Sequence, residues 1–127
     1  MKEKKAIQTS NAPAAIGPYS QAIKSGSLVF ISGQIPLDPS SMELVDSSIS
    51  EQSEQVFKNL SAVAKAAGGS LNDIVKLTIF LTDLNEFGVV NEIMAAHFNK
   101  PYPARATIEV SALPKGAAIE VEAILST

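Results

Sequence analysis

Two short segments combine polar side chains with a tightly turning backbone, which suits them to binding a small ligand. Residues 17–22 (GPYSQA) place Tyr19 directly after a rigid Gly-Pro turn. Residues 31–36 (ISGQIP) end an apolar run with Ser32 and Gly33. Glycine at such a place lets a ligand approach the backbone closely, because no Cβ stands in the way. Both segments are also compatible with an ordinary turn and an ordinary strand end.

Arg105 follows a loop, residues 101–104 (PYPA), that two prolines stiffen. Such a loop loses little conformational entropy when a ligand binds, and a guanidinium matches a carboxylate with paired donors. An arginine by itself is more often part of a surface ion pair. Glu120 and Glu122 alternate with apolar residues on the last expected strand and by default face solvent. His97 is expected to be a partly buried helix residue rather than a catalyst.

The composition excludes much of the familiar catalytic machinery. The 127 residues include no cysteine and one histidine, which excludes thiolate nucleophiles, disulfides and multi-histidine metal sites. Ten Lys and Arg against thirteen Asp and Glu give a formal charge of −3, the wrong sign for a dedicated nucleic-acid binder. No apolar run could span a bilayer and no leader is evident. We expect a soluble cytoplasmic protein without metal or cofactor, and without nucleic-acid or membrane partners.

The elements that must position these residues follow from hydrophobic periodicity and turn signals. With 46% hydrophobic and 18% charged residues, the chain predicts a single globular domain over residues 1–127. The expected strands cover residues 5–9, 21–25, 28–33, 73–81, 106–110 and 118–125, and the expected helices cover 49–67 and 84–99. Ser48 is the expected N-cap of the first helix. The turn at 114–116 is expected to join the last two strands as a hairpin.

This order predicts a mixed six-stranded sheet with both helices packed on one face, an α/β (α+β) fold. Two helices leave the other face of the sheet uncovered. Several strands nevertheless carry apolar residues on both sides, and residues 28–31 (LVFI) form a continuous apolar run. Burial of that face against another subunit is the expected explanation.

Taken in order, short motifs throughout the chain resemble the Rid (YjgF) family, and within it the RidA branch of 2-iminobutanoate/2-iminopropanoate deaminases. The matching motifs are GPYSQA at 17–22, ISGQIP at 31–36, NL at 59–60, TDL at 82–84, VNE at 90–92, PAR at 103–105 and IEVEA at 119–123. Each motif is weak alone, but the ordered set covers almost the whole chain and is highly specific.

The resemblance implies a chorismate-mutase-like fold that forms a homotrimer with a barrel-like core and active sites in the clefts between subunits. By motif match, Arg105 binds the substrate carboxylate and Glu120 handles the attacking water. The residues expected to line the pocket are Tyr19, Ser32, Gly33, Asn91 and Thr107. No metal or cofactor is implied.

The implied activity is hydrolysis of small 2-imino acids, or their enamine tautomers, to 2-keto acids and ammonia. The alternative is a non-catalytic trimer of the same fold that binds small carboxylates or acts as a chaperone. A ribonuclease or translation-inhibitor role, attached to some relatives, is disfavoured by the net charge. Two departures stand out: Thr107 replaces a frequent cysteine, and Ser41-Met42 replaces a frequent Thr-Gly pair. We expect neither to abolish activity.

Overall fold

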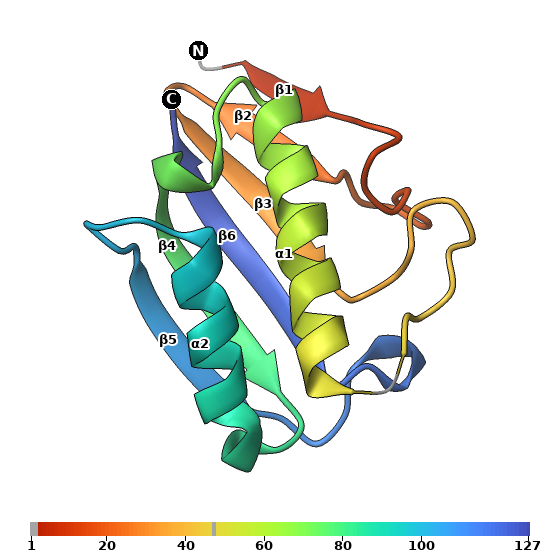
Figure 1. Cartoon of the computed structure of the whole chain (residues 1–127). Helices are drawn as coiled ribbons and strands as arrows, with labels where there is room; N and C mark the ends of the chain where they lie inside the picture. Colours follow the sequence, from red (N-terminus) through yellow and green to blue (C-terminus); the bar gives the residue numbers. More distant parts are fainter. Residues whose placement is uncertain (1–2, 47) are drawn as a thin grey trace.

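Within residues 3–46 and 48–127, which the computed structural model describes, six strands and two α-helices follow one another as the sequence predicts (Figure 1). The strands are β1 Lys4–Ile7, β2 Ala22–Ser25, β3 Leu28–Gln34, β4 Ile74–Leu81, β5 Ala104–Glu109 and β6 Ile119–Ser126. The helices are α1 Ile49–Ala66 and α2 Phe87–His97. Short 3₁₀ turns cover Leu71–Asp73, Leu84–Glu86 and Pro114–Gly116.

The strands form one mixed sheet in the order β1-β2-β3-β6-β4-β5. β6 is antiparallel to both neighbours, and β5 runs parallel to β4 after the crossover through α2. The predicted hairpin of the last two strands is therefore wrong, because β4 lies between them. Ile119, Val121 and Leu125 of β6 are fully buried, whereas no residue of β5 is. β6, whose apolar residues alternate regularly, is a central strand of the sheet, and its apolar face is buried there.

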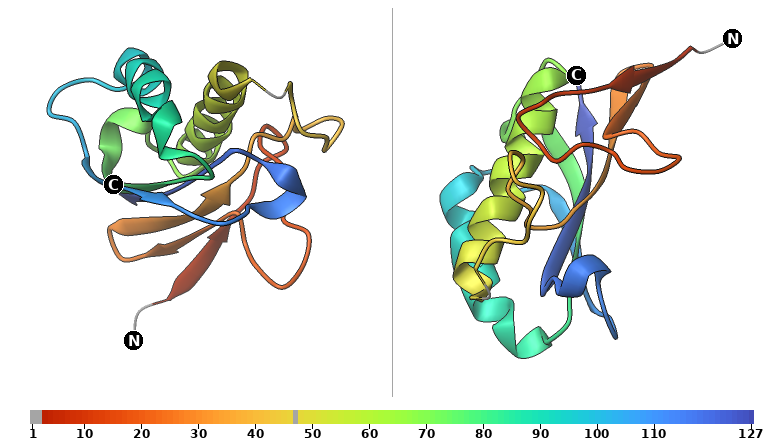
Figure 2. Two further views of the ribbon diagram at one scale, coloured as in Figure 1. Left: turned by 90° about the horizontal axis from the view of Figure 1, so that it is seen from below. Right: turned by 90° about the vertical axis from the view of Figure 1, so that its right-hand side faces the viewer.

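Both helices cover the same face of the sheet, as the two views in Figure 2 show. Phe57, Leu60 and Val63 of α1 pack with Val90 and Met94 of α2 against the inward side chains of β4 and β6. Their spacing of three and four residues is the helical period that the sequence shows, so the predicted layer of helices is confirmed. Neither helix in the described part of the chain is long and apolar enough to cross a membrane.

The starts of the two helices differ in how well the sequence predicts them. α1 begins after Ser48, whose Oγ accepts a hydrogen bond from Glu51 N at 3.1 Å, as expected for an N-cap. α2 begins at Phe87, later than predicted, because the preceding residues form a 3₁₀ turn. Asp83 caps that turn by accepting a hydrogen bond from Asn85 N at 2.9 Å. The predicted start at residue 84 is therefore correct for a helical turn and early for the α-helix itself.

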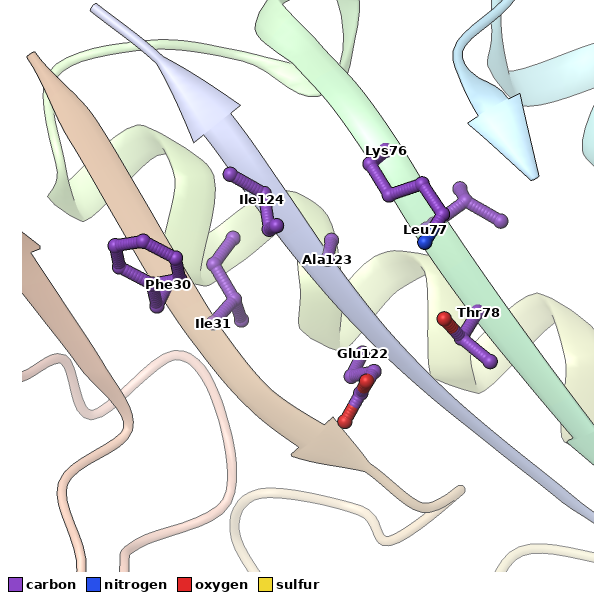
Figure 3. A pocket seen from close by; sticks show the side chains of 8 residues that line it. All are labelled: Phe30, Ile31, Lys76, Leu77, Thr78, Glu122, Ala123 and Ile124. Carbon is purple, nitrogen blue, oxygen red and sulfur yellow. The ribbon is translucent and has the colours of Figure 1, made fainter. Parts of the chain in front are cut away.

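The face of the sheet opposite the helices carries apolar side chains that nothing in this copy covers. Figure 3 views this face, where Phe30 of β3 lies beside Ile124 of β6. Thr78 of β4 is paired with Glu122 of β6. Both residues, together with Lys76, line a pocket on this face. The side chain of Phe30 is 45% exposed. The uncovered apolar face is as the sequence predicts, and its burial in a homotrimer stays a prediction.

Candidate functional site

Glu120 lies in a pocket of about 510 Å³ at the end of the sheet where β3 stops and β6 starts. Tyr19 and Gly33 line the same pocket, so three predicted site residues come together here. The rest of the wall is mainly apolar and includes Ile16 and Leu37. A carboxylate beside apolar groups, close to a backbone without a side chain, is suited to proton transfer on a small bound molecule.

A β-bulge explains why glycine stands opposite this glutamate. The register of β3 against β6 shifts between Ile31 and Gln34, which places the irregularity at Ser32 and Gly33. A Cβ at position 33 would overlap the carboxylate of Glu120 and come within 2.9 Å of its Cδ. The glycine therefore makes room for the glutamate side chain, in addition to giving a ligand access to the backbone.

Ser32 lies at the bulge, but its hydroxyl is used to hold a neighbouring segment. Ser32 Oγ donates a hydrogen bond to Ser20 O at 2.6 Å, and Ser32 N donates to Gln21 O at 3.0 Å. The buried amide of Gln21 in turn donates to Pro13 O at 2.8 Å and to Thr9 O at 3.0 Å. These bonds fix the segment that carries Tyr19 against β3. Contact between Ser32 and substrate stays a prediction.

Burial raises the pKa of Glu120 above its usual range, and repulsion from Glu122 on the same strand face adds to the effect. Both groups are acidic, so each disfavours a second negative charge nearby. A carboxyl group with a raised pKa exchanges protons closer to neutral pH than an ordinary glutamate does. It is therefore better matched to accepting a proton and returning it within one reaction cycle.

We expect Glu120 to titrate above 4.5, the usual value for glutamate. Carboxyl ¹³C chemical shifts, followed by NMR as a function of pH, measure this directly, and the Glu120→Gln spectrum identifies the signal. If the carboxylate is the active form, kcat/KM should fall as the pH drops through the same raised pKa. A Glu122→Gln variant should lower that pKa, because it removes the second cause. A Glu120 titration at or below 4.5 would contradict the expectation.

Replacing Gly33 by alanine should displace the Glu120 carboxylate without unfolding the protein, because the flexible end of the glutamate can move aside. We expect a roughly 10–100-fold loss in any activity that depends on Glu120, as is typical of an ångström-scale misplacement. Gly88→Ala is the matched control, since a Cβ there meets nothing within 4 Å and the residue lies in α2. That variant should keep full activity and gain about 0.5–1 kcal/mol in the free energy of unfolding. Equal activity in both variants would contradict the assignment.

Arg105 lies in a second pocket, at the outer edge of the sheet between β5 and α2. Its guanidinium carbon is 5.0 Å from the centre of the Phe87 ring. Its Nη1 donates to Asn91 Oδ1 at 2.5 Å and to Met94 Sδ at 3.5 Å. Phe87, Asn91 and Met94 follow one another at intervals of four and three residues, so they share one face of α2. Within residues 3–46 and 48–127, no carboxylate pairs with this arginine.

The guanidinium is thus held in place on one side while its charge stays unneutralised by the described residues. An aromatic ring and an amide oxygen both orient an arginine, but neither cancels its positive charge. Tyr102 and Pro103 complete the pocket around it. The arrangement is suited to binding a small anion, and a carboxylate fits the guanidinium with two parallel hydrogen bonds.

Arg105 and Glu120 face opposite sides of the sheet within one copy. Arg105 is paired with Leu77 in the parallel β4–β5 ladder, and Leu77 is buried under the helices. Glu120 is paired with Phe80 on the uncovered face. The strand β4 also separates β5 from β6. A site that uses both side chains on one small molecule therefore needs a second copy of the chain.

Thr107 lies on β5, two residues beyond Arg105 and on the same side of the strand. Its Oγ1 is buried and has no hydrogen-bond partner among the described residues. The sequence analysis did not identify Phe87 and Met94 as contacts of Arg105. Their spacing from Asn91 is the signal that connects them to the arginine.

His97 lies apart from both pockets. Its Nε2 is 2.9 Å from Glu54 Oε2, and its ring centre is 5.5 Å from that of Phe57, so it joins α2 to α1. This agrees with the expectation of a partly buried helix residue. Among the described residues, no group of three or more histidine or acidic side chains is placed to hold a metal ion.

A mixed sheet with two helices on one face, an uncovered apolar face and two separate pockets defines a small α+β protein. The chain belongs to the endoribonuclease L-PSP (YjgF/Rid) family, whose profile matches residues 9–126. The predicted family is therefore confirmed, and with it the fold class.

Individual relatives carry several different names. The chain is 50% identical to the 2-iminobutanoate/2-iminopropanoate deaminase of Mus musculus, over 95% of this chain and 90% of that protein. It is 53% identical to RutC family protein y4sK of Sinorhizobium fredii, over 94% and 95% of the two chains. Among solved structures, RidA from an Antarctic Psychrobacter species superposes with a TM-score of 0.94 at 54% identity, over 97% of this chain and 99% of that one.

Proposed function

We propose that this protein hydrolyses small 2-imino acids, such as 2-iminobutanoate and 2-iminopropanoate, to 2-keto acids and ammonia. The observation that carries the proposal is the Arg105 pocket, where an oriented guanidinium has no acidic partner among the described residues. Relatives of about 50% identity that are named for this activity give independent support. In this proposal Arg105 and Glu120 act on one substrate at the junction of two copies.

Arg105 binds the carboxylate of the substrate and thereby fixes the plane of the neighbouring imine. At ~4 Å, and with an effective dielectric constant near 20, a pair of unit charges is worth about 4 kcal/mol before desolvation is subtracted. The contacts to Phe87 and Asn91 hold the guanidinium beforehand, so little further ordering is needed when the substrate binds. This interaction selects short anions that carry a carboxylate next to the C=N carbon.

Glu120 of a second copy then moves the protons. As water attacks the imine carbon, a new C–O bond forms and Glu120 accepts a proton from that water. Glu120 then returns this proton to the nitrogen, which gives the neutral carbinolamine. The resulting carbinolamine collapses when its nitrogen is protonated and its hydroxyl group loses a proton. The C–N bond breaks, ammonia leaves and the carbonyl of the 2-keto acid forms. A general acid–base group of this kind contributes roughly 10²–10⁴-fold to the rate.

The uncovered face of the sheet supports association of copies into a homotrimer. Its exposed apolar side chains include Phe30 and Ile108, both 45% exposed in the single copy. Exposed apolar surface of this kind is typical of a subunit interface. We include the trimer, and a location in the cytoplasm, in the proposal.

A competition assay tests the proposed activity. Threonine dehydratase releases 2-iminobutanoate from threonine, semicarbazide traps the imine as it forms, and the protein is added in increasing amounts. Hydrolysis by the protein should lower the yield of the imine adduct in proportion to its concentration. An unchanged yield at every concentration would overturn the proposal.

A non-catalytic carboxylate-binding protein of the same fold is the second candidate. It is favoured by the Arg105 pocket, which is formed entirely by one copy. Such a protein requires Arg105 but has no use for a glutamate with a raised pKa. The family name also includes an endoribonuclease, yet the formal charge of −3 is unfavourable for binding a polyanion.

A further inference from the structure

Two buried amide side chains on α1, Gln52 and Asn59, lie behind the Glu120 pocket. They are 2% and 1% exposed, respectively. Burying an amide costs free energy unless its polar atoms find hydrogen-bond partners, so the partners show which segments the two residues hold. Neither residue is among those that line the pocket.

Asn59 holds the segment that follows β3. Its Nδ2 donates to Leu37 O at 2.9 Å and to Ile35 O at 3.3 Å, while its Oδ1 accepts from Gln55 Nε2 at 2.9 Å. Ile35 and Leu37 both line the Glu120 pocket. The amide thus fixes one wall of the pocket through the backbone, from the side that faces the helix.

Gln52 holds the segment that precedes β6. Its Oε1 accepts a hydrogen bond from Ala118 N at 2.8 Å. Ala118 stands two residues before Glu120, and its carbonyl accepts from Thr82 N at 3.2 Å. The position at which β6 begins, and with it the position of Glu120, is therefore set partly by this amide.

Ser53 shows that a polar residue on this face of α1 does not need such partners in order to be buried. It follows Gln52 directly and is 0% exposed, yet its Oγ has no hydrogen-bond partner among the described residues. Gln52 and Asn59, in contrast, both reach backbone atoms of segments that meet at one pocket. Burial alone therefore does not explain these contacts, whereas the need to hold the backbone around the Glu120 pocket does.

We propose that Gln52 and Asn59 are positioning residues, which hold the backbone on both sides of Glu120 and so keep its carboxylate at the place where the reaction needs it. This inference rests on the proposed deaminase function. The two amides touch neither substrate nor reacting atoms. They act through the backbone, and a loosened wall would admit water to the glutamate.

The test compares Gln52→Met with Gln52→Glu and Ser53→Ala in the full-length protein. Methionine keeps the length of the side chain but removes the acceptor for Ala118 N, and we expect kcat/KM for 2-iminobutanoate to fall roughly 10–100-fold. Glutamate retains an acceptor at the same place and should restore most of the activity. Ser53→Ala removes an equally buried polar atom that holds nothing and should leave the activity unchanged.

A second readout separates positioning from simple loss of stability. In Gln52→Met, the ¹³C-detected titration of Glu120 should move to lower pH, because water reaches the carboxylate more easily. Asn59→Leu, which removes the donor to two carbonyl oxygens without adding a charge, should shift the titration in the same direction. The NMR measurement needs no substrate, so it remains decisive if the wild-type protein fails to hydrolyse imines.

Wild-type kcat/KM together with an unchanged Glu120 titration in folded Gln52→Met would overturn the inference. So would failure of both Gln52→Met and Asn59→Leu to fold while Ser53→Ala folds normally, since the amides would then serve the fold rather than the pocket. Loss of activity in Gln52→Glu equal to that in Gln52→Met would also contradict it, because the retained acceptor should matter.

Discussion

Glu120→Gln should lose imine hydrolysis while it still binds a 2-keto acid. Glutamine has almost the size and shape of glutamate, so the pocket beside Gly33 stays filled, but the amide cannot accept a proton from water. We expect a loss of roughly 10²–10⁴-fold in kcat, the usual contribution of a general acid–base group. The Kd for 2-ketobutyrate, measured by calorimetry, should remain close to that of the wild type, because Arg105 is intact.

The same substitution should make the protein more stable at neutral pH. The pKa of Glu120 is raised in the folded state, so between the unfolded and the folded pKa the native protein binds more protons than the unfolded chain. The stability of the wild type therefore falls as the pH rises through that window. Glutamine does not titrate, so the pH dependence of Tm should lose this component. A gain in stability with a loss of turnover is typical of a residue retained for function.

A protein that binds carboxylates without catalysis would give a different result when the wild type and Glu120→Gln are compared in the semicarbazide assay. If Glu120→Gln and the wild type compete equally with semicarbazide for 2-iminobutanoate, Glu120 has no part in turnover. Equal and absent competition by both proteins would favour the carboxylate-binding candidate instead.

The sequence predicts most of the fold because the elements are locally encoded. The helical spacing of Leu60, Val63 and Val90, and the alternation along residues 119–125, each identify an element and its buried face. The error concerns which strands are neighbours. A short turn at 114–116 is typical of a hairpin, but the choice of partner for β6 depends on burial across the whole sheet, which no local pattern specifies.

The candidate site is predictable only in part, and for a similar reason. Tyr19, Gly33 and Glu120 do meet, as the resemblance implies. The contacts that orient Arg105, from Phe87 and Asn91, depend on how α2 docks beside β5. The helical spacing of these residues places them on one face but does not specify that docking. Arg105 and Glu120 themselves lie on opposite faces of one copy. They can meet only when copies of the chain associate. In the sequence, the only sign of this association is the apolar face of the sheet, which is indirect evidence.

Arg105→Ala should abolish productive binding of the substrate and leave the fold intact. The side chain is exposed and its described contacts are confined to α2, so its removal leaves no buried group unpaired. A charge pair worth at most about 4 kcal/mol corresponds to a loss of roughly 10²–10³-fold in kcat/KM. Arg105→Lys should recover only a small part, because a single ammonium group lacks the planar pair of donors. Lys65→Ala changes the net charge equally, outside both pockets, and is the control.

Mixing the two inactive variants distinguishes a site shared between copies from a site within one copy. Each variant alone lacks one half of every site. When Arg105→Ala and Glu120→Gln chains are unfolded together and refolded as mixed oligomers, some junctions combine an intact arginine from one chain with an intact glutamate from its neighbour. In a closed ring with random mixing, about a quarter of the junctions have both groups, so a comparable fraction of wild-type activity should return.

A site built within one chain cannot be rescued in this way, because every chain in the mixture carries one of the two substitutions. The geometry of the single copy makes rescue the expected result: the strand β4 and the thickness of the sheet separate the two side chains. Refolding each variant separately and then mixing them without exchange of subunits is the control, and it should stay inactive. If co-refolded oligomers of wild-type mass show no recovery, Arg105 and Glu120 do not act on the same substrate molecule across a subunit junction.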